Sequence, residues 1–596
     1  MSQTTANPGP TQNIWIGLGC LSIVFHIWLI FSGLVPNLVS RPIHMALALP
    51  WIFIFLSDGK IARWTGVIFT FLGLASCAYI VYFEAELSDQ YGSLEGGLQI
   101  WISAILIITV LEMARRAIGW PLPIITVIAL GYGLYGSYLP GEFGHPGLPV
   151  ESFLGTITVA EGGLWGSLTG VSVNIVAIFV IMGAVLNAGE AGQGFMNMAM
   201  AVAGRLKGGA AKVSVLSSAL FGSISGSASA NVASTGAITL PTMTKLGYPA
   251  RLAGAVEAVA SSGGQIMPPL MGAGAFVMVE LTGVPYTQIM GAALLPAILY
   301  FFTVWVGINA YADRYDLQPL PSDQQPSRRQ VIVTAAFFLV PFMVLLERMF
   351  IGGYTPQYAA VGAILTAFVL LFFDANLSLD RARTLSRFKQ VALATGKQIA
   401  IIASIILCAG LIISVLAQTG LGIKITSLIL SAGGDRMWPA LLLTALACLI
   451  LGMEVPTTAA YVICVSVAGP ALQKLGLEPL LAHLFVFWFA LLSTITPPVC
   501  GAVFIAAGMV GENWLKVAMT SMALGVGLYI IPLGMIANPA IIDFIASPII
   551  ALVMFVKLAL GLAATSYGII SKRHPLARLS LVIFGLAVVF INLPLG

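Results

Sequence analysis

Charged residues are scarce in this sequence: Asp, Glu, Lys and Arg make up 8% of its 596 residues, whereas a soluble domain carries about 25%. Histidine occurs only five times, and the six cysteines are scattered without the spacing of a disulfide framework or a zinc site. These shortages exclude an ordinary soluble domain. They also lead us to expect no cofactor and no nucleic-acid partner.

Apolar chain is abundant instead, since 59% of the residues are hydrophobic. Runs of about 20 apolar residues recur, which is the length that crosses the hydrocarbon core of a bilayer. They predict an all-α polytopic membrane protein in contact with lipid. The first four runs, near 14–35, 42–57, 65–83 and 98–113, contain few polar groups, and we expect them to form a scaffold.

The orientation follows from the positions of the basic residues, because loops rich in Lys and Arg stay in the cytoplasm. Lys60 and Arg63 follow the second run, and Arg115 and Arg116 follow the fourth. Both turns are therefore expected inside, together with the N-terminus. Arg41, on a loop expected outside, is the one exception.

We divide the chain into five parts: the scaffold, a first copy of a repeat, a joining segment with two spans, a second copy, and additional C-terminal spans. Their boundaries are 1–118, 119–312, 313–398, 399–536 and 537–596. Basic residues mark 312–330 and 374–397 as cytoplasmic loops.

The repeat appears at a single gapless offset of 229 residues. It carries Pro241 onto Pro470 and the double proline Pro268-Pro269 onto Pro497-Pro498. It also carries the triplet Lys245-Leu246-Gly247 onto Lys474-Leu475-Gly476. If the last span of each copy finished on the same side, Lys572 and Arg573 would lie outside. Inverted topology avoids this, and inverted repeats with discontinuous helices are typical of secondary transporters.

Each copy has a polar tip followed by a double proline. The first tip is the small, polar, glycine-rich stretch 221–236, and the second lies near 452–461. We expect two re-entrant helical hairpins, near 213–248 and 440–475, and two broken helices. Their free backbone groups suit a hard cation, and their half-helix N-termini suit a carboxylate.

Three carboxyl groups lie in or near the apolar runs. Glu257 and Glu454 are close to the breaks and tips, and if either stays protonated it is a candidate to carry a coupling proton; a structural pair with a backbone N–H or a lysine is the alternative. We expect Glu280 near a membrane surface and His483 as a hydrogen-bonded core residue.

The motifs at 226–231, 257–269 and 452–461 resemble the fused membrane subunit of tripartite ATP-independent periplasmic (TRAP) transporters, in the TAXI branch, where the four-span small subunit and the large subunit form one polypeptide. The resemblance implies an elevator-type importer in the inner membrane of a bacterium or archaeon. It also implies that a periplasmic binding protein delivers a small organic carboxylate and that an ion gradient drives its uptake.

Residue by residue, the resemblance suggests two overlapping sets of ligands. The substrate set is Ser227, Ser229, Asn231, Gln265, Thr457 and Thr458. The cation set is Ser225, Asn231, Gly264, Thr458, Thr494 and Thr496. The chain departs from the non-TAXI pattern at Leu270 and at the second tip, so sodium and proton coupling both stay open.

We therefore expect a secondary active symporter, not an enzyme. Two alternatives remain at this point. One is a stand-alone anion symporter that needs no binding protein. The other is an intramembrane serine protease, for which one of the five histidines, such as His483, would have to lie beside a serine.

Overall fold

The computed structural model describes residues 10–433, 436–452, 456–498 and 500–591. Within these residues every regular element is helical, none is a strand, and ten helices are long and apolar enough to span a membrane. The prediction of an all-α polytopic membrane protein is confirmed. The helices gather into two compact units, residues 1–190 with 337–424 and residues 191–336 with 425–596.

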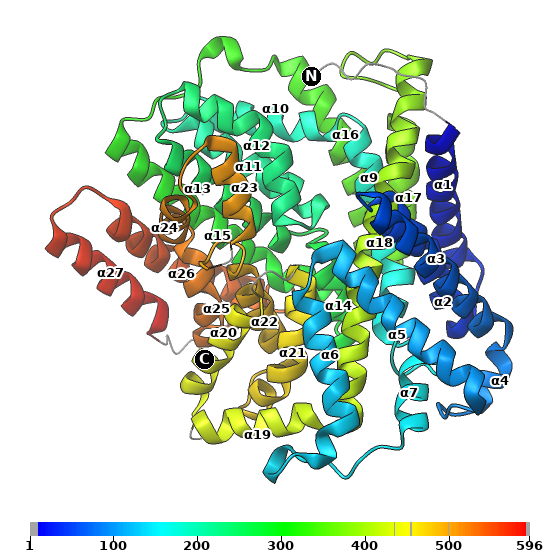
Figure 1. The fold of residues 1–596 in the computed structure, drawn as a ribbon. Helices are drawn as coiled ribbons and strands as arrows, with labels where there is room; N and C mark the ends of the chain where they lie inside the picture. Colours follow the sequence, from blue (N-terminus) through cyan, green and yellow to red (C-terminus); the bar gives the residue numbers. More distant parts are fainter. Residues whose placement is uncertain (1–9, 434–435, 453–455, 499, 592–596) are drawn as a thin grey trace. The chain divides into compact units, whose positions relative to one another are not determined.

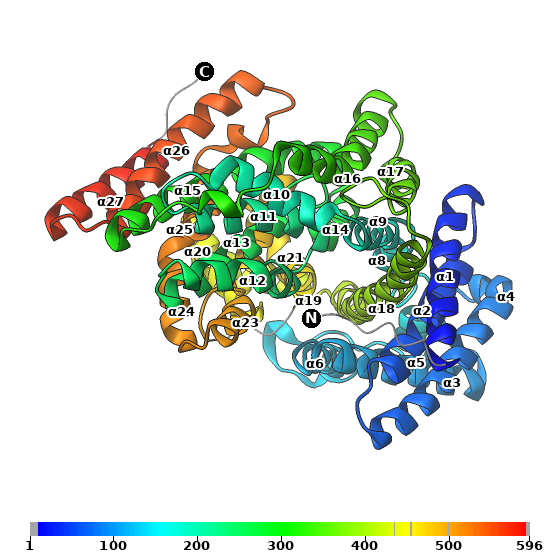
Figure 2. The ribbon, with the colours of Figure 1, turned by 90° about the horizontal axis from the view of Figure 1, so that it is seen from above.

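The first unit is built around one long helix, α18 (Arg381–Thr419), against which α1, α2, α5, α6 and α9 pack (Figures 1 and 2). Its other elements are short or peripheral. The bounds in this unit are α1 (Pro10–Phe31), α2 (Asn37–Pro50), η1 (Trp51–Phe55), α3 (Lys60–Tyr82), α4 (Glu84–Asp89), α5 (Gly96–Ile118), α6 (Pro121–Tyr135), η2 (Gly136–Tyr138), η3 (Gly141–Phe143), α7 (Val150–Thr158), α8 (Ser167–Val171), η4 (Ser172–Val176), α9 (Ala177–Ala188), η7 (Glu347–Ile351) and α17 (Pro356–Leu370).

Two details of this unit correct the sequence analysis. The basic segment 374–397 is a loop only as far as Asp380, whose carboxylate caps α18 by accepting a hydrogen bond from the Ala382 N–H at 2.9 Å. Its remaining residues extend α18 beyond the length that a bilayer requires. Arg41 is not on a loop: it lies in α2, is buried, and donates to the carbonyl oxygen of Trp165, so it says little about orientation.

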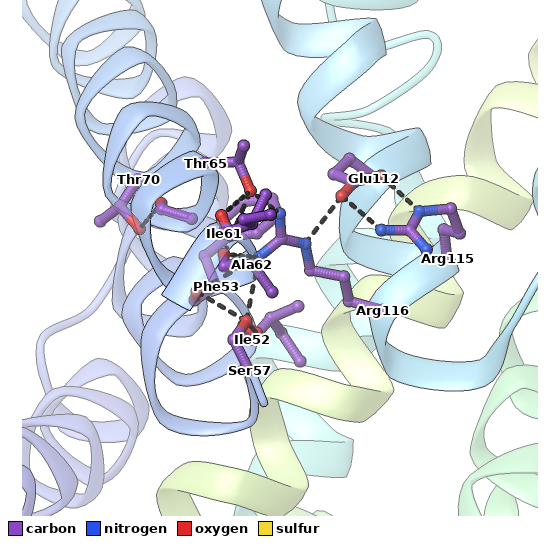
Figure 3. A network of polar contacts seen from close by, with 11 residues as sticks. Ile52, Phe53, Ser57, Ile61, Ala62, Thr65, Thr70, Glu112, Arg115 and Arg116 are labelled. Carbon is purple, nitrogen blue, oxygen red and sulfur yellow. Dashed lines mark hydrogen bonds and ion pairs between the residues drawn. The ribbon is translucent and has the colours of Figure 1, made fainter. Parts of the chain in front are cut away.

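Arg116 ties the end of α5 to the connection between η1 and α3 (Figure 3). Its guanidinium donates to the Ser57 hydroxyl at 2.9 Å and to the Ala62 carbonyl at 2.8 Å. It also forms an ion pair with Glu112 at 2.7 Å. These contacts satisfy backbone carbonyl groups near helix ends and join α5 to η1 and to α3.

The second unit contains the hairpins and the broken helices of both copies of the repeat, whereas residues 119–190 and 399–424 belong to the first unit. Its bounds are α10 (Ala191–Ala203), α11 (Gly209–Ser225), α12 (Ala228–Lys245), α13 (Ala250–Gly263), η5 (Gly264–Ile266), α14 (Gly272–Thr282), α15 (Tyr286–Tyr315), η6 (Ser322–Gln324), α20 (Met437–Leu451), α21 (Thr457–Lys474), α22 (Pro479–Leu492), α23 (Gly501–Val510), α24 (Trp514–Leu524), α25 (Val526–Ala537), η8 (Pro539–Ile542), α26 (Pro548–Ile570) and α27 (Pro575–Phe590). Two further helices, α16 (Arg328–Leu346) and α19 (Leu421–Gly433), run from one unit into the other.

The helix bounds recur at the offset of 229 residues that the sequence shows. Adding 229 to both ends of α12 gives α21 (228 to 457, 245 to 474), and adding it to both ends of α13 gives α22 (250 to 479, 263 to 492). The starts of α14 and α23 are related in the same way, since 272 and 229 make 501. The orientation of the copies across a bilayer stays a prediction.

The two copies exchange their broken-helix arms. α23, from the second copy, packs against α12 and α13 of the first, and α14, from the first, packs against α21 and α22 of the second (Figure 1). The exchange brings both breaks to one packed core, where Pro268, Pro269 and Pro497 stay half-buried and Pro498 is exposed. α13 illustrates this core, because every residue from 252 to 263 is buried.

Candidate functional site

The first predicted tip is a two-residue turn between α11 and α12. Gly226 has a φ of 62°, which favours glycine, and α12 begins at Ala228. The Ser227 hydroxyl accepts a hydrogen bond from the Ala230 N–H at 3.3 Å and so caps α12. The sequence suggested a broken backbone over 221–236. Only Gly226 and Ser227 leave the helices there, because this cap lets α12 begin at once.

Both broken helices are interrupted at their double prolines. In the first copy the chain passes from α13 through the single turn η5 into residues 267–271 before α14 begins. In the second copy residues 493–500 separate α22 from α23. Pro268-Pro269 and Pro497-Pro498 are both joined by cis peptide bonds. Backbone carbonyls and N–H groups near these breaks are released from helical hydrogen bonding.

The first tip and the first break approach backbone to backbone. A Cβ atom added to Gly222 would lie 2.5 Å from the Cα of Gly264, and one added to Gly226 would lie 2.8 Å from the Cα of Gly272. Such distances leave no room for any side chain. These glycines therefore let α11 contact the broken helix directly.

Asn231 joins the same elements through its side chain. It is fully buried, and its amide nitrogen donates to the carbonyl oxygen of Ser218 at 2.9 Å and to that of Ser261 at 3.4 Å. The nitrogen thus links α12 to α11 and to α13. The predicted ligand Ser225 is also engaged locally, donating to the carbonyl oxygen of Ser227 at 3.4 Å.

The two breaks meet side chain to side chain. The Thr494 hydroxyl lies 2.8 Å from the Ser262 hydroxyl, so residues at the ends of α22 and α13 are in contact. Ser229, in the first turn of α12, faces the start of α23, since a Cβ at Gly501 would lie 3.5 Å from its Oγ. The first tip, the first break and the second break therefore form one neighbourhood.

The remaining predicted ligands stand around this neighbourhood. Thr496 makes a 2.7 Å hydrogen bond with Tyr529, a partner that the sequence analysis missed. Gln265 is 4% exposed, and its amide makes no hydrogen bond with any residue that the structure describes. It is the position equivalent to Thr494, since 265 and 229 make 494.

The second tip is described only in part. Glu454 lies outside the described residues. Thr457 and Thr458 form the first turn of α21, and their hydroxyls make no hydrogen bond within the described part of the chain. Gly452, before the gap, lies against Ser493, because a Cβ there would meet the serine side chain at 3.1 Å. The second tip thus contacts the second break, as the first tip contacts the first.

Glu257 lies at the centre of the first copy and is fully buried. Five hydroxyl groups, which we call the hydroxyl cage, surround its carboxyl group; they belong to Ser214, Ser218, Thr235, Thr239 and Ser261. Ser214 is 2.8 Å from Oε2, Ser218 is 3.3 Å from Oε1, and the two threonines are close partners. No basic side chain forms an ion pair with Glu257 among the described residues.

The sequence analysis named Glu257 but missed most of its cage. The missed signal is a spacing of four residues on each of three consecutive helices: Ser214 and Ser218, Thr235 and Thr239, Glu257 and Ser261. Residues four apart share one helix face. Three such polar pairs, on helices otherwise rich in apolar residues, indicate faces that meet.

His483 is a core residue, as expected. Its Nδ1 makes a 2.7 Å hydrogen bond with the Tyr461 hydroxyl, and both side chains are buried. The structure does not pair this histidine with a serine in the described residues. The arrangement gives no support to a Ser–His dyad at His483. A histidine and a serine do meet in the first unit, where His44 Nε2 lies 3.0 Å from the Ser172 hydroxyl, but neither residue belongs to a tip or a break.

A family model for the DctM component of tripartite ATP-independent periplasmic transporters matches residues 105–565, well over half of the chain. The chain is 27% identical over 343 residues to the C4-dicarboxylate TRAP transporter large permease protein DctM of Pseudomonas aeruginosa, which covers 56% of this chain and 77% of that protein.

Two further relatives are also TRAP transporter large permease proteins, and their names give different substrates. Identity is 26% over 346 residues to the ectoine TRAP transporter large permease protein TeaC of Halomonas elongata, covering 57% of this chain and 78% of TeaC. It is 23% over 338 residues to the 2,3-diketo-L-gulonate TRAP transporter large permease protein YiaN of Escherichia coli, covering 56% of this chain and 77% of YiaN.

Proposed function

Because the chain belongs to the family of the DctM component of tripartite ATP-independent periplasmic transporters, we propose that it is a secondary active symporter that imports a small organic carboxylate across the bacterial inner membrane. The family is a transporter component and not an enzyme family. Its large permeases work with a periplasmic binding protein and a small subunit. A sodium gradient, a proton gradient or both would drive the uptake.

The observation that carries this proposal is the contact between Ser262 and Thr494 at 2.8 Å. It joins the breaks of two helices that belong to different copies of one repeat. Discontinuous helices that meet at a repeat interface form the ion and substrate sites of many secondary transporters. The proposed ligands therefore surround this contact: Ser225, Ser227, Ser229, Asn231, Gly264, Gln265, Thr457, Thr458, Thr494 and Thr496.

A carboxylate suits this site because helix N-termini, and not basic side chains, would bind it. The described tip and break residues, 221–236, 261–273, 456–461, 493–498 and 500–502, include no Lys, Arg or His. Helix N-termini at α12, α21, α14 and α23 supply N–H groups and positive dipole ends instead. C4-dicarboxylates, ectoine and 2,3-diketo-L-gulonate, named for the relatives, all contain a carboxylate group.

The helices before the family match would take the place of a separate small subunit. The match begins at residue 105, within α5, so α1 to α4 precede it. We assign this role to the four spans of residues 1–118, which are α1, α2 continued by η1, α3, and α5, in which the match begins, as in the TAXI branch and with the N-terminus in the cytoplasm. They would brace a static scaffold while the hairpins and broken helices carry the substrate in an elevator-type movement.

Reconstituted uptake tests the proposal. The purified chain is placed in liposomes with and without the binding protein encoded beside its gene, and a panel of labelled C4-dicarboxylates, hydroxy acids and keto acids is offered under separate sodium and pH gradients. Uptake that requires both a gradient and the binding protein is expected. Equal uptake without the binding protein would favour the stand-alone symporter, and no gradient-dependent uptake of any carboxylate would overturn the proposal.

A further inference from the structure

The hydroxyl cage can hold Glu257 in either protonation state. A backbone N–H or a basic side chain only donates and so favours a carboxylate, whereas a hydroxyl donates or accepts by rotating. Two members of the cage also have a second acceptor nearby. The Thr235 hydroxyl lies 2.8 Å from the Asn231 carbonyl oxygen, and the Thr239 hydroxyl lies 3.1 Å from the Thr235 carbonyl oxygen. One proton can thus be gained or lost by reorienting hydroxyl groups alone.

The charged and titratable groups on the surrounding helices are directed elsewhere. α11, α12, η5, α15, α23 and α24 pack against α13. Apart from Glu257, the groups on α11, α12 and α13 are Lys212, which lies 5.1 Å from the ring of Trp305; Lys245, at the end of α12; and Arg251, bonded to Tyr315. The groups on α15 are Tyr286, bonded to the Pro269 and Leu270 carbonyls; Tyr300, bonded to the Val259 carbonyl; and Tyr311, Asp313, Arg314 and Tyr315, near its end. α24 carries Lys516, paired with Glu512. α23 and η5 contribute none. Glu257 therefore has hydroxyl groups, and no fixed charge, as its polar partners among the described residues.

Members of the cage also bond to one another. The hydroxyl oxygens of Ser218 and Thr235 are 3.0 Å apart, which is a hydrogen-bond distance. Both also contact Oε1 of Glu257. A proton at this carboxyl group would therefore join groups that are already in hydrogen-bond contact.

The cage is connected to the proposed substrate site. Thr235 contacts Glu257 with the same hydroxyl that reaches the Asn231 carbonyl oxygen at 2.8 Å and its Oδ1 at 3.4 Å. When Glu257 is a carboxylate, Thr235 donates to it. When Glu257 is protonated, its own O–H donates to Thr235, which then donates to Asn231. The protonation state of a buried carboxyl group is therefore passed on to a residue at the tip of the first hairpin.

We propose that Glu257 binds and releases the coupling proton of this transporter, and that Thr235 acts as a positioning residue that transmits the change to Asn231. This role rests on the proposed function, because only a coupled transporter uses such a proton. One proton passes from the outer solution to a carboxylate oxygen on loading and leaves to the inner solution on release, and no other bond is made or broken. Since Glu257 is fully buried, exchange requires the hairpin to separate from the broken helix, which ties protonation to the transport cycle.

The test uses the full-length protein in liposomes with its binding protein, the labelled carboxylate that the wild type takes up, and a pH-sensitive dye inside. Glu257→Gln keeps the shape of the side chain and removes the titrating group. We expect accumulation driven by a pH gradient to fall at least about tenfold, dye-reported proton entry to be lost, and exchange of labelled for unlabelled substrate to persist at a rate that no longer depends on pH.

Glu280→Gln is the matched control, because this glutamate belongs to the same copy but is exposed on α14. It should behave as the wild type. Proton-driven accumulation by Glu257→Gln at the wild-type level would overturn the inference. So would wild-type uptake that follows sodium and ignores the pH gradient, a result that leaves the proposed function intact. Wild-type protein that takes up no carboxylate under any gradient overturns both.

A second pair of variants decides the matter if Glu257→Gln does not fold. Thr235→Val keeps the volume and removes the transmitting hydroxyl, while Thr242→Val removes a hydroxyl of the same helix that bonds only to the Ile238 carbonyl at 2.9 Å. Thr235→Val should shift the pH midpoint of uptake by about one unit or more, and Thr242→Val should not. An unchanged midpoint in Thr235→Val overturns the transmitting role.

Discussion

The two copies of the repeat have the same helices and very different interiors. The bounds of α12 and α13 return in α21 and α22 after 229 residues, and both copies break at a double proline. Yet none of the polar residues around Glu257 returns. The residues at the equivalent positions of Ser214, Ser218, Thr235, Thr239, Glu257 and Ser261 are Leu443, Ala447, Cys464, Ala468, Val486 and Ala490.

This difference separates what the fold needs from what one copy adds. Helix lengths, tips and breaks occur twice, so they belong to the architecture that both copies share. A fully buried carboxyl group costs several kcal/mol unless it is well hydrogen-bonded, and only the first copy supplies the hydroxyls. The second copy fills the same space with apolar side chains and adds the buried Tyr461–His483 hydrogen bond. The first copy therefore has the more polar interior.

The largest expected effects come from the tips, where both copies present polar side chains. Asn231→Ala and Thr458→Ala should each abolish uptake, a loss of about tenfold or more. Their stabilities should differ. Asn231 donates to two carbonyls, so its loss should lower the melting temperature, whereas Thr458 makes no described hydrogen bond and its loss should not. Uptake and melting temperature of both variants check this, and normal transport by either removes it from the site.

The next effect tests the backbone contact between Gly222 and Gly264 in the first copy. A Cβ at Gly264 would lie 2.5 Å from the Cα of Gly222, so Gly264→Ala should cost roughly 1–3 kcal/mol of folding free energy by overpacking and reduce uptake severalfold. The equivalent position in the second copy is Ser493. Ser493→Ala should be close to wild type in thermal unfolding and uptake. Equal effects of the two variants would contradict the contrast between the copies.

A smaller effect is expected where the copies touch. Thr494→Val removes the hydroxyl that contacts Ser262 at 2.8 Å, at a cost of about 1 kcal/mol for one hydrogen bond. Transport should slow severalfold without loss of the fold. Ser262→Ala removes the other partner, and the double variant should be no worse than the more impaired single variant. Additive losses would show that the two hydroxyls act independently.

The smallest effect is expected in the apolar interior of the second copy. Tyr461→Phe removes the hydroxyl bonded to His483 at 2.7 Å and should destabilise the protein by about 1 kcal/mol. The balance between sodium-driven and proton-driven uptake should stay as in the wild type. A changed balance would mean that the second copy also takes part in coupling.

Much of the fold could be predicted from the sequence, because the membrane restricts a chain to helices whose apolar runs and prolines are visible. The offset of 229 and both proline breaks were visible for this reason. The length of the turn at the first tip was not, since the Ser227 cap decides where α12 begins. The basic segment before residue 398 was assigned to a loop because charge indicates a membrane side but not a helix end.

The site was predictable in composition and not in pairing. Polar residues at the tips and breaks stood out against apolar chain. The contact between Ser262 and Thr494 joins residues 232 positions apart, and no local pattern indicates such a pair. The hydroxyl cage was partly predictable. Its four-residue spacings were present in the sequence, but they gain meaning only once three helices are known to turn those faces toward Glu257.

Because α14 and α23 each pack against the opposite copy, neither copy of the repeat forms a closed core by itself. In a chain with one copy alone, the hairpin faces that the other copy's broken-helix arm covers would be exposed. Association with a second identical chain would be the natural way to cover them. Joining two such copies in one chain fixes their ratio at one to one and allows the sequence of each copy to change separately. A dimer of two identical copies would bury one such carboxyl group in each copy. In this chain the first copy buries Glu257, and the equivalent position of the second copy is Val486.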